Sequence, residues 1–215
     1  MFNNCDSKTN GEYLFYLQLK DKINIIFDVG CRSDSEFLDF TGEVHYFDTV
    51  SEFIDNLKNQ PNKNKSAFFN NFGLSFENNN IYYYPKYQSF FDRVNSCKLS
   101  DNENKIILNI KKSIDYVVQN NIKYIDFLKI DTEGFEYNVL LGFEDFLKNI
   151  KIIQFEYGGT FLDNNIKLID VINLLKQHGF NKFSYLTNNG SELIKDFTDH
   201  YQYCNIVCIN ENLIS

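Results

Sequence analysis

The sequence predicts an α/β fold in which a mainly parallel sheet is covered by helices on both faces. Short apolar runs alternate with segments of helical pattern along most of the chain. Three of the runs carry an acid at or near their end, at Asp28, Asp48 and Asp131. The 215 residues suit one sizeable core, and no Pro-rich or Gly-rich linker divides them. We therefore expect a single domain over residues 1–215.

The N-terminal half begins with an apolar segment that ends at Gly30, which predicts a strand followed by a turn. Phe53, Ile54 and Leu57 then recur at helical spacing. In this half we expect helices at about 34–40 and 50–58, and strands at 24–29, 43–48, 66–72, 81–84 and 105–110.

The C-terminal half contains a buried strand ending at Ile130, followed by apolar residues at helical spacing from Phe135 to Leu147. Gly179 is a stop signal for another helix. In this half we expect helices at about 113–120, 135–148 and 166–178, and strands at 125–130, 151–157, 181–186 and 204–209.

Composition limits the classes of partner. A net charge of −8 argues against nonspecific binding to nucleic acid or to an anionic membrane. The sequence has no apolar run of membrane-spanning length, and its first residues lack the features of a signal peptide. The five cysteines are scattered without a CxxC pair. We expect a cytoplasmic protein with reduced cysteines and no structural zinc.

The acids at the strand ends are the candidate functional residues. Asp131, Glu133 and Glu136 crowd the carboxyl end of a buried strand, where open α/β sheets bind ligands. Such a cluster suits a cation, a hydroxyl or a ribose, although Glu136 also fits a plain first-turn helix acid. Asp28 is a costly buried carboxylate that a ligand ammonium or backbone amides would satisfy. Asp48 follows at the distance of a ribose-binding acid, or serves as a helix N-cap.

The turn after the first strand argues against a nicotinamide cofactor. Residues 31–35, Cys-Arg-Ser-Asp-Ser, do not complete a GxGxxG fingerprint. A nicotinamide-dependent oxidoreductase is therefore a disfavoured alternative.

Four segments together resemble the FkbM family of S-adenosylmethionine-dependent methyltransferases, over about residues 24–210. The most specific is Leu-Lys-Ile-Asp-Thr-Glu-Gly-Phe-Glu at 128–136. The others are Phe-Asp-Val-Gly at 27–30, Val-His-Tyr-Phe-Asp at 44–48 and Ile-Ile-Gln-Phe-Glu at 152–156.

The resemblance implies a class I methyltransferase fold, with a seven-stranded sheet in the order 3-2-1-4-5-7-6. It also implies S-adenosylmethionine as cofactor and methyl transfer to a hydroxyl. Carried over by position, Asp28 and Gly30 would lie by the methionine part, Asp48 by the ribose hydroxyls, and Asn71, Phe72 and Gly73 by the adenine. The chain departs from the family at Arg32-Ser33-Asp34, where a second glycine is usual, and at Asp48-Thr49, where Glu-Pro is more frequent.

The candidate catalytic residues are Asp131, Glu133, Glu156 and Lys129, which end two strands that are neighbours in the implied order. A carboxylate whose pKa is raised by its neighbours would act as the general base. Alternatively, Asp131 and Glu156 would hold Mg²⁺ and so acidify the hydroxyl. We favour the route without a metal.

A Tyr-rich stretch predicts the substrate loop. Residues 76–104 would form an insertion over the cleft, in which Tyr84 and Tyr87 stack on a sugar and Lys86 and Arg93 hold a phosphate. The alternative is an edge hairpin with packed aromatic residues. We expect the acceptor to be a sugar or nucleotide-sugar for a surface polysaccharide. A different small metabolite, or a non-catalytic cofactor-binding module, are the alternatives.

Overall fold

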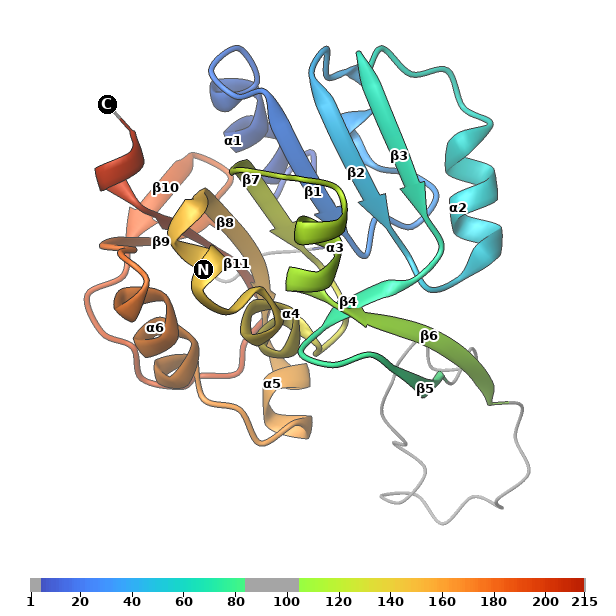
Figure 1. Cartoon of the computed structure of the whole chain (residues 1–215). Helices are drawn as coiled ribbons and strands as arrows, with labels where there is room; N and C mark the ends of the chain where they lie inside the picture. Colours follow the sequence, from blue (N-terminus) through green and yellow to red (C-terminus); the bar gives the residue numbers. More distant parts are fainter. Residues whose placement is uncertain (1–4, 84–104, 215) are drawn as a thin grey trace.

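The computed structural model describes residues 5–83 and 105–214. They form a large sheet with helices packed on it and a smaller sheet beside one edge (Figure 1). The strands of the large sheet lie in the order β10-β9-β11-β8-β7-β1-β2-β3. Their bounds are β1 Ile25–Val29, β2 Glu43–Phe47, β3 Ser66–Asn70, β7 Ile125–Ile130, β8 Ile150–Tyr157, β9 Lys182–Thr187, β10 Gly190–Leu193 and β11 Cys204–Ile209.

The α/β class with a mainly parallel sheet is confirmed. Strands β3, β2, β1, β7 and β8 are successive neighbours and run parallel. β11 is antiparallel to both β8 and β9, and β10 is antiparallel to β9. Because parallel strands end at one edge of a sheet, the acids at the carboxyl ends of β1, β2, β7 and β8 are gathered there: Asp28 and Glu156 near the ends of β1 and β8, Asp48 and Asp131 directly after β2 and β7.

The expected seven strands and their order 3-2-1-4-5-7-6 are corrected, because the described sheet has eight strands in the order given above. The additional strand is β10, which turns back from β9 and forms the edge of the sheet. β11 inserts between β8 and β9. The sequence does not predict β10, because this strand is four residues long and almost fully exposed and therefore lacks an alternation of apolar residues.

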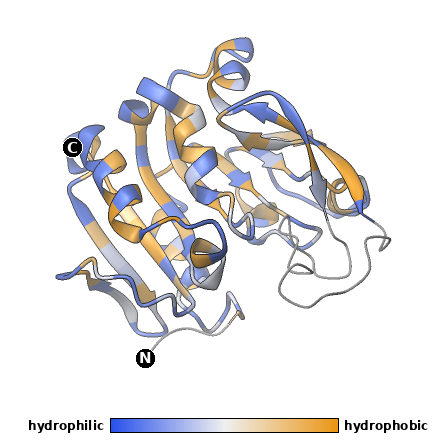
Figure 2. Cartoon of the chain, turned by 90° about the horizontal axis from the view of Figure 1, so that it is seen from below, coloured by the Kyte–Doolittle hydropathy of each residue, from blue (hydrophilic) through white to orange (hydrophobic). Residues whose placement is uncertain are grey.

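Helices cover both faces of the large sheet. In β1, Phe27 and Val29 pack into a core with α3, α4 and α6, whereas Ile26 packs into a second core with α1 and α2. Figure 2 shows the hydrophobic colouring concentrated on the strands and on the inner sides of the helices. The helices are α1 Glu12–Leu19, α2 Ser51–Lys58, α3 Ser113–Gln119, α4 Glu136–Phe143, α5 Gly159–Asp163 and α6 Leu168–Gln177.

The smaller sheet has the order β4-β6-β5, with β4 (Gly73–Ser75) parallel and β5 (Asn79–Tyr83) antiparallel to β6 (Ile106–Lys112). β5 and β6 overlap the strands predicted at 81–84 and 105–110, apart from residue 84, which lies outside the described residues, and they are partners in this sheet. Most of the predicted insertion, residues 84–104, lies outside the described residues, and the insertion stays a prediction.

The sequence does not predict helix α1, and the pattern of buried and exposed residues in this helix explains why. Glu12 and Tyr16 are buried, while Leu14 and Leu17 are partly exposed. The face that packs on the sheet therefore carries a carboxylate, which removes the apolar period of an ordinary surface helix.

Two predicted helices differ from the structure. The segment predicted at 34–40 is only a 3-10 turn, η1 (Glu36–Asp39). The helix predicted at 135–148 is α4 followed by a separate 3-10 helix, η3 (Glu144–Asn149). The break falls at Glu144, whose φ of 52° does not continue an α-helix.

Candidate functional site

A pocket opens at the carboxyl ends of β1, β2 and β7, and the small sheet forms part of its wall. Its polar lining includes Arg32, Asp48, Asp131 and Glu133. Its apolar lining includes Phe53, Leu74, Ile81, Ile110 and Phe135. The pocket therefore combines acceptors for hydroxyl groups with walls suited to a flat ring.

The floor of the pocket depends on Gly30. Its φ is +86°, and a Cβ at this position would lie 1.8 Å from the carbonyl oxygen of Asp131. Both the backbone conformation and the close approach of two chains require glycine here. The Gly30 N–H donates to the Phe47 carbonyl at 2.8 Å, so the turn also joins the end of β1 to the end of β2.

Asp48 is buried at the end of β2, and two backbone amides hold it. Oδ2 accepts from the Arg32 N–H at 3.0 Å, and Oδ1 accepts from the Val50 N–H at 2.9 Å. Burial raises the pKa of Asp48, while these two hydrogen bonds oppose the rise. Each carboxylate oxygen has a further acceptor site, so Asp48 can still accept from two ligand hydroxyls.

The loop after β7 is held by the first residue of α4. Oε1 of Glu136 accepts from the Thr132 N–H at 2.9 Å, the Thr132 hydroxyl at 3.0 Å and the Gly134 N–H at 3.1 Å. Glu136 is buried, and burial raises its pKa to about 7 against these hydrogen bonds. The prediction of a first-turn helix acid is confirmed, and the structure adds that this acid shapes the loop carrying Glu133.

Asp131 and Glu156 meet at the ends of the neighbouring strands β7 and β8. Their side chains are hydrogen-bonded, and burial together with the Asp131 charge raises the pKa of Glu156 far above its usual value. Glu156 is therefore protonated near neutral pH and donates to the Asp131 carboxylate. The Asp131 side chain is 33% exposed, so it reaches the pocket while Glu156 supports it from the sheet.

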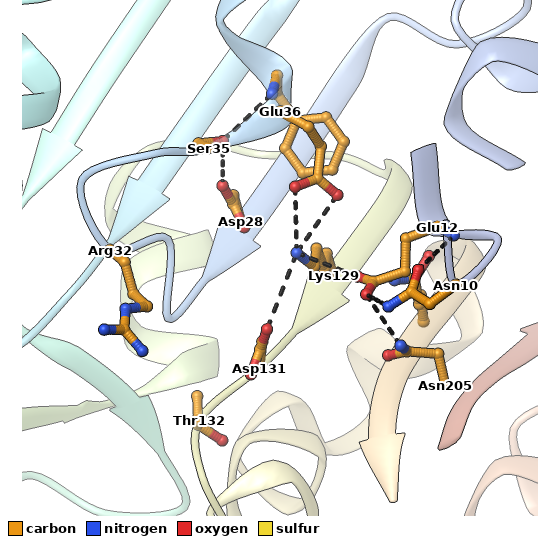
Figure 3. A network of polar contacts seen from close by, with 12 residues as sticks. Asn10, Glu12, Asp28, Arg32, Ser35, Glu36, Lys129, Asp131, Thr132 and Asn205 are labelled. Carbon is orange, nitrogen blue, oxygen red and sulfur yellow. Dashed lines mark hydrogen bonds and ion pairs between the residues drawn. The ribbon is translucent and has the colours of Figure 1, made fainter. Parts of the chain in front are cut away.

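Lys129 is the buried cation next to this pair. Its Nζ lies 3.3 Å from Glu12, 3.3 Å from Glu36 and 3.9 Å from Asp131 (Figure 3). Burial alone would lower the pKa of Lys129, but Glu36, Glu12 and Asp131 together raise it well above its usual value. Lys129 therefore stays charged.

Asp28 lies beneath the turn, directly across from Lys129 in the register of β1 and β7. Its Oδ2 accepts from the Ser35 hydroxyl at 2.5 Å, and burial raises its pKa to about 7 against the effect of Lys129. The partners of Asp28 are thus a hydroxyl and a nearby lysine.

A profile of the methyltransferase FkbM domain matches residues 28–182, which is more than half of the chain. The chain belongs to the FkbM methyltransferase family. The matched segment contains Gly30 and the strand-end acids Asp28, Asp48, Asp131 and Glu156.

Three of the similar solved structures have low sequence identity to this chain. A putative rRNA-methylase from Clostridium thermocellum is 10% identical with a TM-score of 0.46, covering 93% of this chain and 95% of that one. Plantazolicin methyltransferase BpumL, in complex with a pentazolic desmethylPZN analog and SAH, is 13% identical with a TM-score of 0.46, covering 95% and 82%. Precorrin 8W decarboxylase from Methanobacterium thermoautotrophicum is 14% identical with a TM-score of 0.43, covering 91% and 87%. At these TM-scores no assignment rests on them. A search of curated proteins gave no match.

The pocket of this FkbM-family chain brings together five of the residues that the sequence singled out. Gly30, Asp48, Gly73, Asp131 and Glu133 all line it, although they come from four separate segments. Glu133 has a φ of 54°, a left-handed conformation stabilised by the loop that Glu136 holds.

Five other predicted residues do not line this pocket: Asp28, Asn71, Phe72, Lys129 and Glu156. Asn71 donates to the carbonyl oxygens of Asp48 and Thr49 and so supports the loop after β2. Phe72 packs against Phe47 in the core and lies under Lys111. Of the three residues expected near an adenine, Gly73 alone therefore lines the pocket.

The predicted substrate residues Tyr84, Lys86, Tyr87 and Arg93 lie outside the described residues. No motif in the sequence singles out Glu12, Glu36 or Phe53, and Tyr83 is expected only as part of the Tyr-rich substrate insertion at 76–104. Tyr83 and Phe53 line the pocket, and Arg32 lies over the Phe53 ring at 5.5 Å. Strand register and side-chain packing bring Tyr83 and Phe53 to the pocket, and no sequence motif indicates this.

Among residues 5–83 and 105–214, no group of three or more His, Cys, Asp or Glu side chains is arranged to hold a metal ion. Within the same ranges, no helix has the length and apolar character needed to cross a membrane.

Proposed function

We propose that this chain is an S-adenosylmethionine-dependent O-methyltransferase. The observation that supports this most is that Asp48 and Asp131 both line one pocket of this FkbM-family chain. One acid suits a ribose and the other suits the reacting end of a cofactor, and apolar residues line the space between them.

The residues present fit this cofactor. Asp48 keeps one acceptor site on each oxygen for the two ribose hydroxyls. Leu74, Ile110 and Phe53 offer apolar surface for the adenine. The surplus of carboxylates around Asp131 suits the ammonium and sulfonium charges. When bound, the cofactor supplies a methyl group that is already activated for displacement.

The protein then has to align and deprotonate an acceptor hydroxyl. With the cofactor bound, Asp131 would accept the hydroxyl proton while the methyl group passes from the sulfonium to the acceptor oxygen and leaves a neutral thioether. Glu156 remains protonated and orients Asp131 through their hydrogen bond. Lys129 compensates part of the carboxylate charge, and Glu133 is placed at the pocket wall to contact the acceptor.

For the acceptor we propose a sugar or nucleotide-sugar, with surface polysaccharide as the destination. The support is the resemblance of the motifs and the Tyr-rich stretch that holds Tyr84, Lys86, Tyr87 and Arg93. The proposed partner is thus a small molecule in the cytoplasm.

A non-catalytic module that binds the cofactor is the second candidate. It is favoured by Arg32, which occupies the turn where the family usually has a glycine and extends its side chain over Phe53 at the pocket wall. That side chain narrows the space for a ligand.

Two measurements separate these proposals. Calorimetry with S-adenosylmethionine and S-adenosylhomocysteine at up to millimolar concentration should show binding, and no binding would refute both. A panel of sugars and nucleotide-sugars should then yield a methylated product by mass spectrometry. Binding without any product would favour the non-catalytic module.

A further inference from the structure

Lys129 is held from the side of helix α1, away from the pocket. Its ammonium is closer to Glu12 and Glu36, at 3.3 Å each, than to Asp131, at 3.9 Å. The side chains of Glu12 and Glu36 are only 5% and 12% exposed. The shorter contacts of this buried cation therefore go to two carboxylates that do not line the pocket.

Glu12 is itself fixed by donors from three parts of the chain. Its Oε1 accepts from Asn10 Nδ2 at 2.5 Å and from Asn205 Nδ2 at 2.9 Å, and its Oε2 accepts from Gln154 Nε2 at 2.9 Å. Figure 3 shows Glu12 between Asn10, Asn205 and Lys129. A buried carboxylate with this many donors has one orientation, so it can set the position of the ammonium that it contacts.

The charge balance explains why that position matters. The single ammonium of Lys129 faces several acids, and one positive charge cannot neutralise all of them. If Lys129 moved onto Asp131, that carboxylate would lose part of its capacity to accept a proton or attract a cation. The titratable groups around Lys129 and Asp131 are Glu12 on α1, Asp28 on β1, Glu36 on η1, Glu133 and Glu136 after β7, Glu156 on β8 and Tyr203 before β11.

We propose that Glu12 is a positioning residue: it holds Lys129 Nζ on the α1 side of the sheet and so keeps Asp131 available to the substrate. The catalytic consequence rests on the proposed function, but the position of Lys129 does not. Glu12 and Asn205 both lie outside residues 28–182, so the FkbM motifs by themselves do not indicate this arrangement.

The test compares Glu12→Gln, which keeps the shape and removes the charge, with Glu12→Asp, which keeps the charge. Glu192→Gln, on the exposed edge strand β10, is the matched control. In cofactor-free protein, NMR couplings across hydrogen bonds report which carboxylates pair with the Lys129 ammonium. The signal is assigned by its loss in Lys129→Arg.

Wild type, Glu12→Asp and Glu192→Gln should show no coupling between Lys129 and Asp131, whereas Glu12→Gln should gain one. Absence of that coupling in Glu12→Gln would overturn the proposal. If Glu12→Gln fails to fold, Asn205→Ala serves instead, because it removes one donor to Glu12. Asn205→Ala should show a Lys129–Asp131 coupling that is absent from wild type but weaker than the one expected for Glu12→Gln. A spectrum of Asn205→Ala without this coupling would again overturn the proposal.

Turnover tests the consequence. Methyl transfer by Glu12→Gln should fall about tenfold in kcat, with little change in the KM of the cofactor, because an added ion pair lowers the reactivity of Asp131. Unchanged kcat despite the new coupling would contradict the role in catalysis. If wild type transfers no methyl group, the proposed function fails, while the NMR result still decides the role of Glu12.

Discussion

Gly30 lies against the backbone of Asp131 at the meeting point of β1 and β7, with room for hydrogen only. A Cβ on Gly30 would be 1.8 Å from the Asp131 carbonyl oxygen, and the Asp131 N–H donates to Val29 at 2.9 Å. This contact joins the first glycine turn to the most specific motif of the chain. The geometry of the pocket floor therefore depends on it.

We expect Gly30→Ala to lower the free energy of unfolding by about 3 kcal/mol or more, since it adds a clash to left-handed strain of about 1–3 kcal/mol. Urea unfolding measures the change. Gly190→Ala carries the strain alone, with φ +125° and nothing within 4 Å, and Gly159→Ala carries neither effect. A loss for Gly30→Ala no larger than that for Gly190→Ala would show that the contact with Asp131 is unimportant.

Asp131→Asn should abolish turnover and leave the fold intact. Loss of a general base reduces turnover by about 10²–10⁴-fold, whereas this side chain is partly exposed and its removal disturbs little packing. Methyl transfer and thermal unfolding are measured together, with Asp145→Asn as an exposed control. Wild-type activity in Asp131→Asn would refute the assigned role.

Asp48→Asn should weaken binding of S-adenosylhomocysteine about tenfold or more, because hydrogen bonds to a charged group contribute about 1.5–3 kcal/mol. The amide retains one acceptor oxygen, so the loop contacts with Val50 and Arg32 are only partly lost. Calorimetry should show a smaller loss for an analogue without the ribose 2′-hydroxyl. Equal losses for both ligands would separate Asp48 from the ribose, and the exposed neighbour Asp34→Asn serves as control.

The free energy of unfolding should depend on pH through the titration of Glu136. Its pKa rises from 4.5 to about 7 on folding, so the folded state holds its proton more tightly. The contribution to stability is complete below pH 4.5 and is lost as the pH rises through about 7. Between pH 4.5 and 8, the free energy of unfolding of wild type should fall by up to about 3 kcal/mol relative to that of Glu136→Gln. A constant difference in unfolding free energy across this range would contradict the assignment.

Metal removal distinguishes the two chemical routes. The carboxyl of Glu156 is protonated near neutral pH, and a protonated carboxyl is a poor ligand for Mg²⁺. Turnover should therefore be unchanged by a chelator and by added magnesium. Loss of activity in the chelator with recovery on adding Mg²⁺ would instead establish the metal route through Asp131 and Glu156.

The sequence indicates those features whose cause is local. Gly30 marks a turn because its neighbours are an apolar strand and a helix start, and the acids at 28, 48 and 131 mark strand ends directly. Strand β10 and helix α1 were missed because an exposed edge strand and a helix that buries Glu12 lack the apolar periods on which such predictions depend.

The sequence by itself determined the α/β class, the parallel strand ends that carry acids, and the FkbM motifs. Tertiary structure decided which of those acids act together. Asp131 meets Glu156 because β7 and β8 are parallel neighbours, and Lys129 meets Glu12 because α1 packs on the face of the sheet beside β7. Such partners are fixed by strand register and helix packing, and a charged side chain has no period that reveals its partner across more than 100 residues of chain.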